Sequence, residues 1–164
     1  MSEFKSPVPM PGPGVTAPEP YREFYGMPMF VILPTADVEE SKDFWIRGLG
    51  FIDLFSAPRN QVVHLRRWAF QDVLLVPGEP MPEPTLMSTS FSCVLDEIEP
   101  IAARCEELRP GSTTAPVEQP WNSVELTVIT PENARVVMTA ARRIDPDSPV
   151  ADNLRELGID LPRG

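Results

Sequence analysis

The sequence predicts an α+β domain made of two tandem βαβββ modules, and two observations support this prediction. First, a helix start recurs in the same setting, because an apolar run precedes Asp37 with Glu40 three residues on, and another precedes Asp96 with Glu99 three residues on. A side-chain acceptor followed at i+3 by Glu is typical of a helix N-terminus. Second, each expected helix is followed by about three short segments rich in β-branched and aromatic residues, which predicts strands.

Length, composition and charge limit the classes of protein to consider. The chain has 164 residues, 42% hydrophobic and 23% charged, which is typical of one globular domain. Its formal net charge of −10 opposes binding to phosphate backbones and anionic lipid surfaces, so we expect no nucleic-acid and no membrane partner. The N-terminus lacks the apolar segment of a signal peptide, and we expect a cytoplasmic protein. Cys93 and Cys105 are too few for a disulfide framework and are expected to be reduced core residues.

Proline, with 21 residues, divides the chain into parts. The predicted parts are a Pro-rich N-terminal arm (1–27), a domain (28–142) whose modules (28–77 and 86–142) are joined by a linker (78–85), and a C-terminal tail (143–164). The arm ends in Tyr21, Phe24 and Tyr25, which are costly to leave in water. We therefore expect the end of the arm to pack against another part of the protein.

The first module is expected to contain four strands and one helix. The strands are expected at residues 29–33, 51–55, 61–68 and 72–76, with turns at Pro58 and Asn60. The helix begins at Asp37 and is expected to end near Gly48 and Gly50, because glycine commonly ends helices.

The second module repeats this order and is followed by a short helix in the tail. Its strands are expected at residues 91–95, 113–117, 124–129 and 135–140. Its helix runs from Asp96 to a stop at Gly111, and one face carries the apolar stripe Ile98, Ile101, Ala102, Cys105 and Leu108. That face is expected to be buried. In the tail, a peripheral helix is expected near residues 150–157, with Leu154 and Leu157 on one face.

This tandem order resembles the vicinal-oxygen-chelate superfamily of glyoxalase I, extradiol dioxygenases, fosfomycin-resistance enzymes and bleomycin-resistance proteins. Its first strand and helix are similar to Val31–Phe51, VILPTADVEESKDFWIRGLGF, and the Leu-Pro-x-x-Asp version is most similar to the bleomycin-resistance, metal-free binding branch. The second half of that branch is similar to Ser90–Glu107 and to the region of Pro120, Trp121 and Glu125. The resemblance implies an open, curved mixed sheet around a cleft, and a homodimer in which both chains build each cleft.

Enzymes of that superfamily hold a divalent metal with His or Gln and Glu side chains. The resemblance assigns the corresponding positions of this chain to Phe30, Thr89 and Val137, and none of these is an ordinary metal ligand. The single histidine, His64, cannot form a metal site alone. We therefore expect no metal and no cofactor.

Aromatic side chains are the better indication of a site. Strand alternation puts His64, Arg66 and Trp68 on one face of their strand, Phe30 with Ile32 on another, and Trp121 with Glu125 on a third. The expected ligand-binding residues are therefore Phe30, Ile32, His64, Arg66, Trp68, Trp121 and Glu125. Flat apolar faces with a few acids suit a small, planar, cationic aromatic ligand. On this interpretation Trp68 and Trp121 contribute more to binding than His64.

Several functions are compatible with these residues. We favour a non-catalytic protein, with no catalytic residue, that confers resistance by sequestering an antibiotic or another natural product. The alternative is a metal-independent lyase or isomerase of the same fold that uses His64 or Glu125 as its base. An interaction protein that presents the Pro-rich segment 9–13 to a partner is also compatible. Purely structural roles stay open as well, with His64 at a strand surface and the tryptophans in the core.

Overall fold

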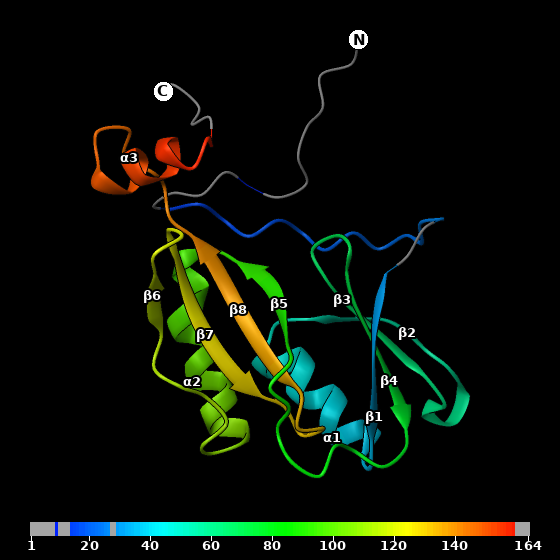
Figure 1. Cartoon of the computed structure of the whole chain (residues 1–164). Helices are drawn as coiled ribbons and strands as arrows, with labels where there is room; N and C mark the ends of the chain where they lie inside the picture. Colours follow the sequence, from blue (N-terminus) through cyan, green and yellow to red (C-terminus); the bar gives the residue numbers. More distant parts are fainter. Residues whose placement is uncertain (1–8, 10–13, 27–28, 160–164) are drawn as a thin grey trace.

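The computed structural model describes residues 9, 14–26 and 29–159, and it confirms an α+β domain of two tandem βαβββ modules (Figure 1). The first module contains β1 (Phe30–Thr35), α1 (Val38–Asp43), β2 (Ile52–Ser56), β3 (Val63–Arg67) and β4 (Gln71–Pro77). The second contains β5 (Ser88–Cys93), α2 (Ile98–Leu108), β6 (Val117–Gln119), β7 (Ser123–Ile129) and β8 (Arg135–Ala141). The tail forms α3 (Pro149–Glu156).

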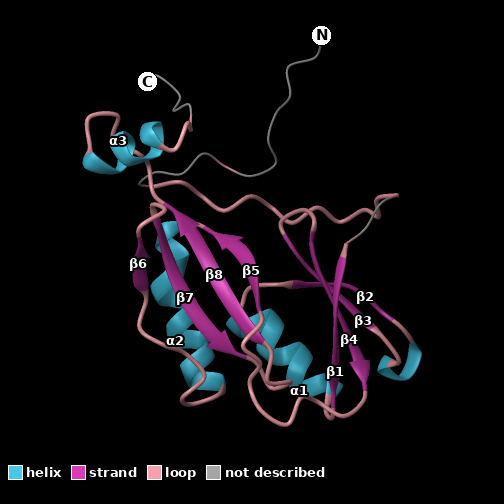
Figure 2. Cartoon of the chain, viewed as in Figure 1, coloured by secondary structure: helices cyan, strands magenta, loops and turns pink. Residues whose placement is uncertain are grey.

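Each module forms its own four-stranded mixed sheet (Figure 2). Sheet A has the strand order β1-β4-β3-β2, and sheet B has the equivalent order β5-β8-β7-β6. In both, the first strand pairs in parallel with the last, and the remaining pairs are antiparallel. The parallel pair requires a crossover, which α1 supplies in the first module and α2 in the second.

The two helices begin in different ways. Asp37 caps α1 as expected, since its Oδ1 accepts hydrogen bonds of 3.0 Å from the amides of Glu39 and Glu40. In the second module the expected cap at Asp96 is wrong. A 3₁₀ turn, Leu95–Glu97, precedes α2, and the Glu97 carboxylate accepts from the amide of Val94. The 3₁₀ turn and the Glu97 carboxylate thus supply hydrogen-bond acceptors to backbone amides just before the α-helix begins.

The apolar stripe of α2 is buried as predicted. Ile98, Ile101 and Cys105 are at most 3% exposed, and Ala102 and Leu108 pack against the same core. A π-helical turn, Phe44–Gly48, extends α1 and contacts α2. The two modules therefore pack through their helices and share one core.

Three aromatic rings lie where the modules meet. Trp45 is fully buried and makes edge-to-face contacts with Phe51 at 4.9 Å and Phe91 at 5.9 Å between ring centroids. Its Nε1 donates to the Glu132 carboxylate at 3.3 Å. Because Phe91 and Glu132 belong to the second module, Trp45 joins the two halves of the chain.

Arg67 adds a polar connection between the modules. Its guanidinium donates to the Ser92 carbonyl at 2.8 Å, the Leu49 carbonyl at 3.0 Å and the Glu97 carboxylate at 2.6 Å. Ser92 and Glu97 belong to the second module, and the arginine side chain is 2% exposed. Its charge is thus matched by the partly exposed Glu97 carboxylate, and two backbone carbonyls accept its other hydrogen bonds.

One predicted strand is misplaced. Residues 113–117 do not form a strand, and β6 covers only Val117–Gln119. The amide and hydroxyl of Thr113 both donate to the Glu106 carboxylate of α2, and Thr113 makes only an isolated bridge to Val128. A side-chain acceptor has taken the amide that a strand ladder would use.

The tail helix forms near its expected position. Ser148 caps α3 by accepting from the Ala151 amide at 3.2 Å, with Pro149 at the first helical position. Ala151 is fully buried, whereas Leu157 is 76% exposed. Leu154, three residues after Ala151, is half-buried, so α3 packs through Ala151 and Leu154 and leaves Leu157 at the surface.

The described part of the arm, drawn in blue in Figure 1, runs extended across one end of both sheets. Its end packs on sheet A, where the Tyr21 amide donates to the Trp68 carbonyl at 2.8 Å. Met10–Pro13 of the proposed partner-binding segment lie outside the described residues. No helix in the described ranges is long and apolar enough to cross a membrane.

Candidate functional site

The outer face of sheet A, opposite the helices, carries most of the expected site residues. Alternation along β3 sends Val63 and Leu65 into the core and His64 and Arg66 to the outer face. The strand register then builds two rows across the sheet. One row joins Phe30, Asp72 and Arg66, and the other joins Ile32, Leu74, His64 and Phe55. We call these seven residues the sheet A wall.

The wall is apolar at its rim and charged at its centre. Ile32 is 60% exposed and Phe55 49%, whereas the side chains of Arg66 and Asp72 are completely buried. Asp72 Oδ1 accepts from Arg66 Nε and from His64 Nε2, both at 2.7 Å. We call His64, Arg66 and Asp72 the polar cluster.

Burial controls the protonation of the polar cluster. It raises the pKa of Asp72 to about 6. Burial, followed by the adjacent Arg66 charge, lowers the pKa of His64 from its ordinary 6.5. At neutral pH Asp72 is therefore ionised and His64 is neutral, and the Nε2–H of His64 donates to the carboxylate. The aspartate balances the charge of Arg66.

The single histidine makes this arrangement measurable. In an NMR titration of the folded chain, the His64 ring resonances are expected to titrate with a midpoint below 6.5, because burial and Arg66 both disfavour the imidazolium. The same chain in urea supplies the control and should titrate near the ordinary value. A folded-state midpoint at or above 6.5 would contradict the burial of His64.

The end of the arm lies over the polar cluster. We call residues 18–25 the strap. Arg66 Nη1 donates to the carbonyls of Tyr21 at 2.9 Å and Glu23 at 2.6 Å, and the Tyr25 hydroxyl donates to Asp72. The Tyr25 ring lies over the Arg66 guanidinium, 4.4 Å from its centre. The strap thus satisfies cluster atoms that would otherwise face solvent.

Aromatic rings flank the imidazole. The Phe30 ring makes an edge contact with His64 at 5.2 Å, and the Phe24 ring lies 5.8 Å away at a tilt. His64 is consequently only 5% exposed, although Phe24 itself is 68% exposed. The wall and the strap together give His64 an aromatic surrounding.

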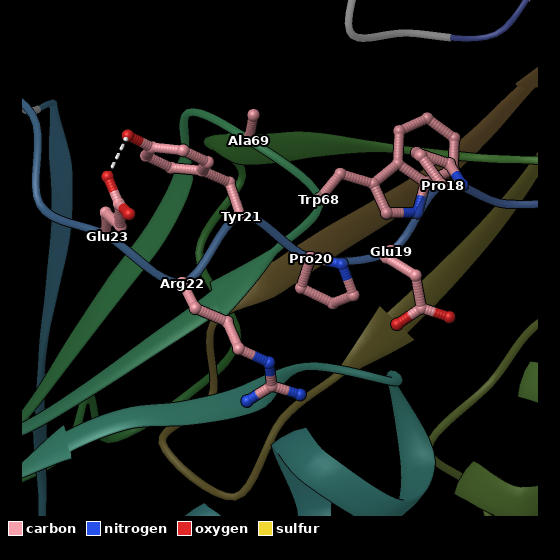
Figure 3. Close-up of a pocket in the computed structure, with 8 residues that line it drawn as sticks. All are labelled: Pro18, Glu19, Pro20, Tyr21, Arg22, Glu23, Trp68 and Ala69. Atoms are coloured by element: carbon pink, nitrogen blue, oxygen red, sulfur yellow. Dashed lines mark hydrogen bonds between the residues drawn. The ribbon is translucent and has the colours of Figure 1, made fainter.

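Trp68 lies beneath the strap rather than on an open face. It is 4% exposed and lines an open hollow of about 630 Å³ together with Tyr21 and two acids of the strap, Glu19 and Glu23 (Figure 3). The Trp68 backbone has a positive φ of 51° in the β3–β4 turn, which takes its side chain out of strict strand alternation. Its carbonyl accepts from the Tyr21 amide of the strap at 2.8 Å, and the Arg67 guanidinium lies 5.4 Å from the centre of its ring.

Glu125 lies on β7 of sheet B, whereas Trp121 lies in the β6–β7 turn rather than on the strand that the sequence predicted, and the two form a pair of their own. Trp121 Nε1 donates to Glu125 Oε1 at 2.8 Å, and the Ser123 hydroxyl donates to the same oxygen at 3.1 Å. Trp121 is 60% exposed. Among the described residues, no hydrogen bond or aromatic contact joins this pair to the sheet A wall. The expected site residues therefore fall into two groups on two sheets.

The positions that the resemblance assigned to metal ligands do not fit a metal. Phe30 and Val137 have no donor atom. Thr89 lies on the same face of β5 as the buried Phe91 and Cys93, so it does not face outward. The outward position is Ser90, whose hydroxyl lies 3.3 Å from that of Thr139. Within the described ranges, no three His, Cys, Asp or Glu side chains are grouped so that they could hold a metal ion.

The cysteines are buried, as the sequence predicted. Burial raises the pKa of both Cys93 and Cys105 to about 12. Thiols with such values stay protonated at neutral pH and are not nucleophiles.

Sequence reasoning missed two members of the site, Asp72 and Tyr25. A signal for Asp72 was present, because it is the one acid in an otherwise apolar strand segment, DVLLV, and the adjacent strand carries His64 and Arg66. No sequence signal pairs Tyr25 with Asp72, because their contact depends on how the arm folds back.

Comparison with known proteins finds similarity in structure only. No protein-family model and no curated protein matches the chain significantly. An integron cassette protein, HFX_CASS4, from the mobile metagenome of the Halifax Harbour sewage outfall is 23% identical, with a TM-score of 0.55 over 71% of this chain and 99% of that one. The fosfomycin resistance protein FosX from Mesorhizobium loti is 13% identical, with a TM-score of 0.56 over 73% and 94%.

A glyoxalase/bleomycin resistance protein/dioxygenase from Nocardioides is 15% identical, with a TM-score of 0.54 over 77% of this chain and 90% of that one. The second and third of these neighbours are named for fosfomycin resistance and for the glyoxalase/bleomycin resistance/dioxygenase group, which are proteins of the vicinal-oxygen-chelate type. At these identities the likeness establishes the fold, which is the tandem modular fold of that superfamily.

Proposed function

We propose that the chain is a small-molecule binding protein that sequesters an aromatic natural product on the sheet A wall without changing it chemically. The observation that carries this proposal is the wall itself. Phe30, Ile32 and Phe55 present exposed apolar surface around a polar cluster whose charges are matched within the protein. Exposed apolar surface beside a few convergent polar groups is typical of a ligand site.

The neighbours support a link to resistance. Two of them are named for resistance to fosfomycin or bleomycin. The metal-free binding that the sequence resemblance implies agrees with the described residues, in which no three His, Cys, Asp or Glu side chains are grouped to hold a metal ion. The acids Glu19 and Glu23 beside Trp68 and Tyr21 favour a planar, cationic compound, because carboxylates and aromatic faces both attract cations.

We further propose that the protein is a homodimer and that sheet B of a second copy, with Trp121 and Glu125, forms the opposite wall. The exposed apolar face of sheet A and the unpaired edge of β1 would otherwise face water. Such a dimer brings together the two groups of expected site residues that a single chain keeps apart.

The test is titration of the protein with planar, cationic, intercalating antibiotics, followed by calorimetry and light scattering. Ile32→Ala is expected to weaken binding about tenfold or more, because burying one aliphatic side chain contributes about 1.5–3 kcal/mol. Leu157→Ala is the matched control, since Leu157 is an exposed aliphatic side chain of the tail helix, and it should leave affinity unchanged.

Two results would contradict the proposal. Equal effects of the two variants on affinity would show that the ligand does not bind to sheet A. A protein that stays monomeric at micromolar concentration and still binds one ligand would show that a second copy does not form the opposite wall.

A second function is favoured by one observation, the 2.7 Å contact between His64 and Asp72. A neutral histidine oriented by a carboxylate is a suitable general base, and a metal-independent lyase or isomerase could use it. The two functions differ in what His64→Ala does. Loss of a measurable turnover with unchanged ligand affinity would favour the enzyme, whereas absence of turnover in the wild type favours sequestration.

A further inference from the structure

The strap is attached to the sheet A wall by its backbone. The Tyr21 amide donates to the Trp68 carbonyl at 2.8 Å, and the Tyr21 and Glu23 carbonyls accept from Arg66 Nη1 at 2.9 and 2.6 Å. Backbone contacts of this kind hold the segment extended and do not depend on the strap's side chains.

The side chains of the strap add a second set of contacts. The Tyr25 hydroxyl donates to Asp72, and the Tyr25 ring covers the Arg66 guanidinium. The Phe24 ring lies beside His64. Every member of the polar cluster is therefore contacted by the strap.

The strap leaves one cluster atom unsatisfied. Arg66 Nη2 is buried and, among the described residues, has no hydrogen-bond partner. A buried donor without an acceptor is costly, so the strap is an imperfect occupant of this position. An occupant with one more oxygen acceptor would satisfy the guanidinium better.

We propose that the strap is a latched lid, which must leave Arg66 and Asp72 before a ligand can reach His64 and the polar cluster. This inference rests on the proposed function for the identity of the ligand-binding face, and it adds the step that opens that face.

The contacts of the strap also indicate which polar groups a ligand must carry to replace it. A compound that replaces the strap must supply oxygen acceptors to Arg66 Nη1 and Nη2, a hydroxyl or amine donor to Asp72, and an aromatic ring beside His64. The matching chemical class is an aromatic compound whose ring carries a donor group next to carbonyl oxygens.

The lid can be tested on the full-length chain without any ligand. Trypsin cleavage after Arg22 requires the strap to detach, because anchored carbonyls lie on both sides of that bond. Diethyl pyrocarbonate, which acylates neutral imidazole, reports access to His64, the only histidine of the chain. Cleavage after the buried Arg67 reports global unfolding and must stay slow in every variant used.

Tyr25→Phe removes the hydroxyl that reaches Asp72 and keeps the ring over Arg66. It is expected to raise both rates about tenfold, the factor that corresponds to 1.4 kcal/mol and to the lower end of a hydrogen bond to a charged group. Tyr21→Phe is the matched control, because its hydroxyl reaches only the exposed Glu23, and both rates should stay at the wild-type value.

The outcomes separate cleanly. Parallel acceleration of both reactions in Tyr25→Phe alone supports the lid. Faster cleavage with unchanged His64 modification would mean that the strap detaches without opening the cluster, and the lid would be wrong. If Tyr25→Phe and Tyr21→Phe had equal cleavage and modification rates, the Tyr25 hydroxyl would not hold the lid closed. Rapid His64 modification in the wild type would also show that the strap does not cover the cluster. Because no ligand is used, a failed ligand titration leaves this result intact.

Discussion

Replacing Asp72 with alanine is expected to destabilise the folded chain by about 3–5 kcal/mol, because the change leaves the buried guanidinium of Arg66 without its counter-charge. Both side chains are completely buried, and one nitrogen of Arg66 already has no partner in the part of the chain that the structure describes. The remaining acceptors of Arg66 are the two strap carbonyls, which carry no net charge. The loss is measured by equilibrium urea unfolding followed by circular dichroism.

Asp53→Ala is the control for this prediction. Asp53 pairs with Lys42 at 2.6 Å, but the two side chains are 31% and 22% exposed, and such pairs contribute about 1 kcal/mol or less. A double variant, Asp72→Leu with Arg66→Met, should recover much of the lost stability, because it removes both charges together. If Asp72→Ala were no more destabilising than Asp53→Ala, the polar cluster would not be a buried charge pair.

Trp45→Ala is expected to lower the free energy of unfolding by about 3–5 kcal/mol, the usual range for truncating a buried tryptophan. Trp45 is fully buried, and its ring contacts Phe51 in its own module and Phe91 in the other. The variant therefore opens a cavity where the two modules meet, and the Glu132 carboxylate loses its indole donor. Urea unfolding of the variant and the wild type gives the difference.

Trp121→Ala is the matched control, because it removes the same side chain from a position that is 60% exposed. We expect a loss below about 1 kcal/mol, since among the described residues this ring makes one hydrogen bond, at the surface, to Glu125. Similar losses in both variants would contradict a shared core centred on Trp45.

The sequence predicted the fold well where the signals are local. The Asp37 cap, the stripe of α2 and the strand pattern each depend on residues a few positions apart. The predictions that failed concern competition between neighbours. Glu97 rather than Asp96 serves the start of α2, and Glu106 takes the Thr113 amide from the expected strand. Both acceptors are glutamates of α2 or of the turn before it. Residue spacing alone does not determine which acceptor a given backbone amide will use.

The candidate site was predicted in part. Alternation correctly paired His64 with Arg66 on one face of β3 and Phe30 with Ile32 on one face of β1. Only the strand register shows that these two faces lie on the same side of sheet A. It did not anticipate that Trp68 lies under the arm, because the positive φ of Trp68 belongs to a turn.

The sequence by itself determined the α+β class, the two βαβββ modules and the apolar character of the sheet A wall, because periodicity and capping act over one or two turns of chain. Only the tertiary structure decided that Asp72 lies between His64 and Arg66, and that the strap covers all three. Tyr25 and Asp72 are 47 residues apart. Contacts at that distance depend on strand register and on the docking of the arm, which are set by the packing of the whole chain rather than by any local pattern.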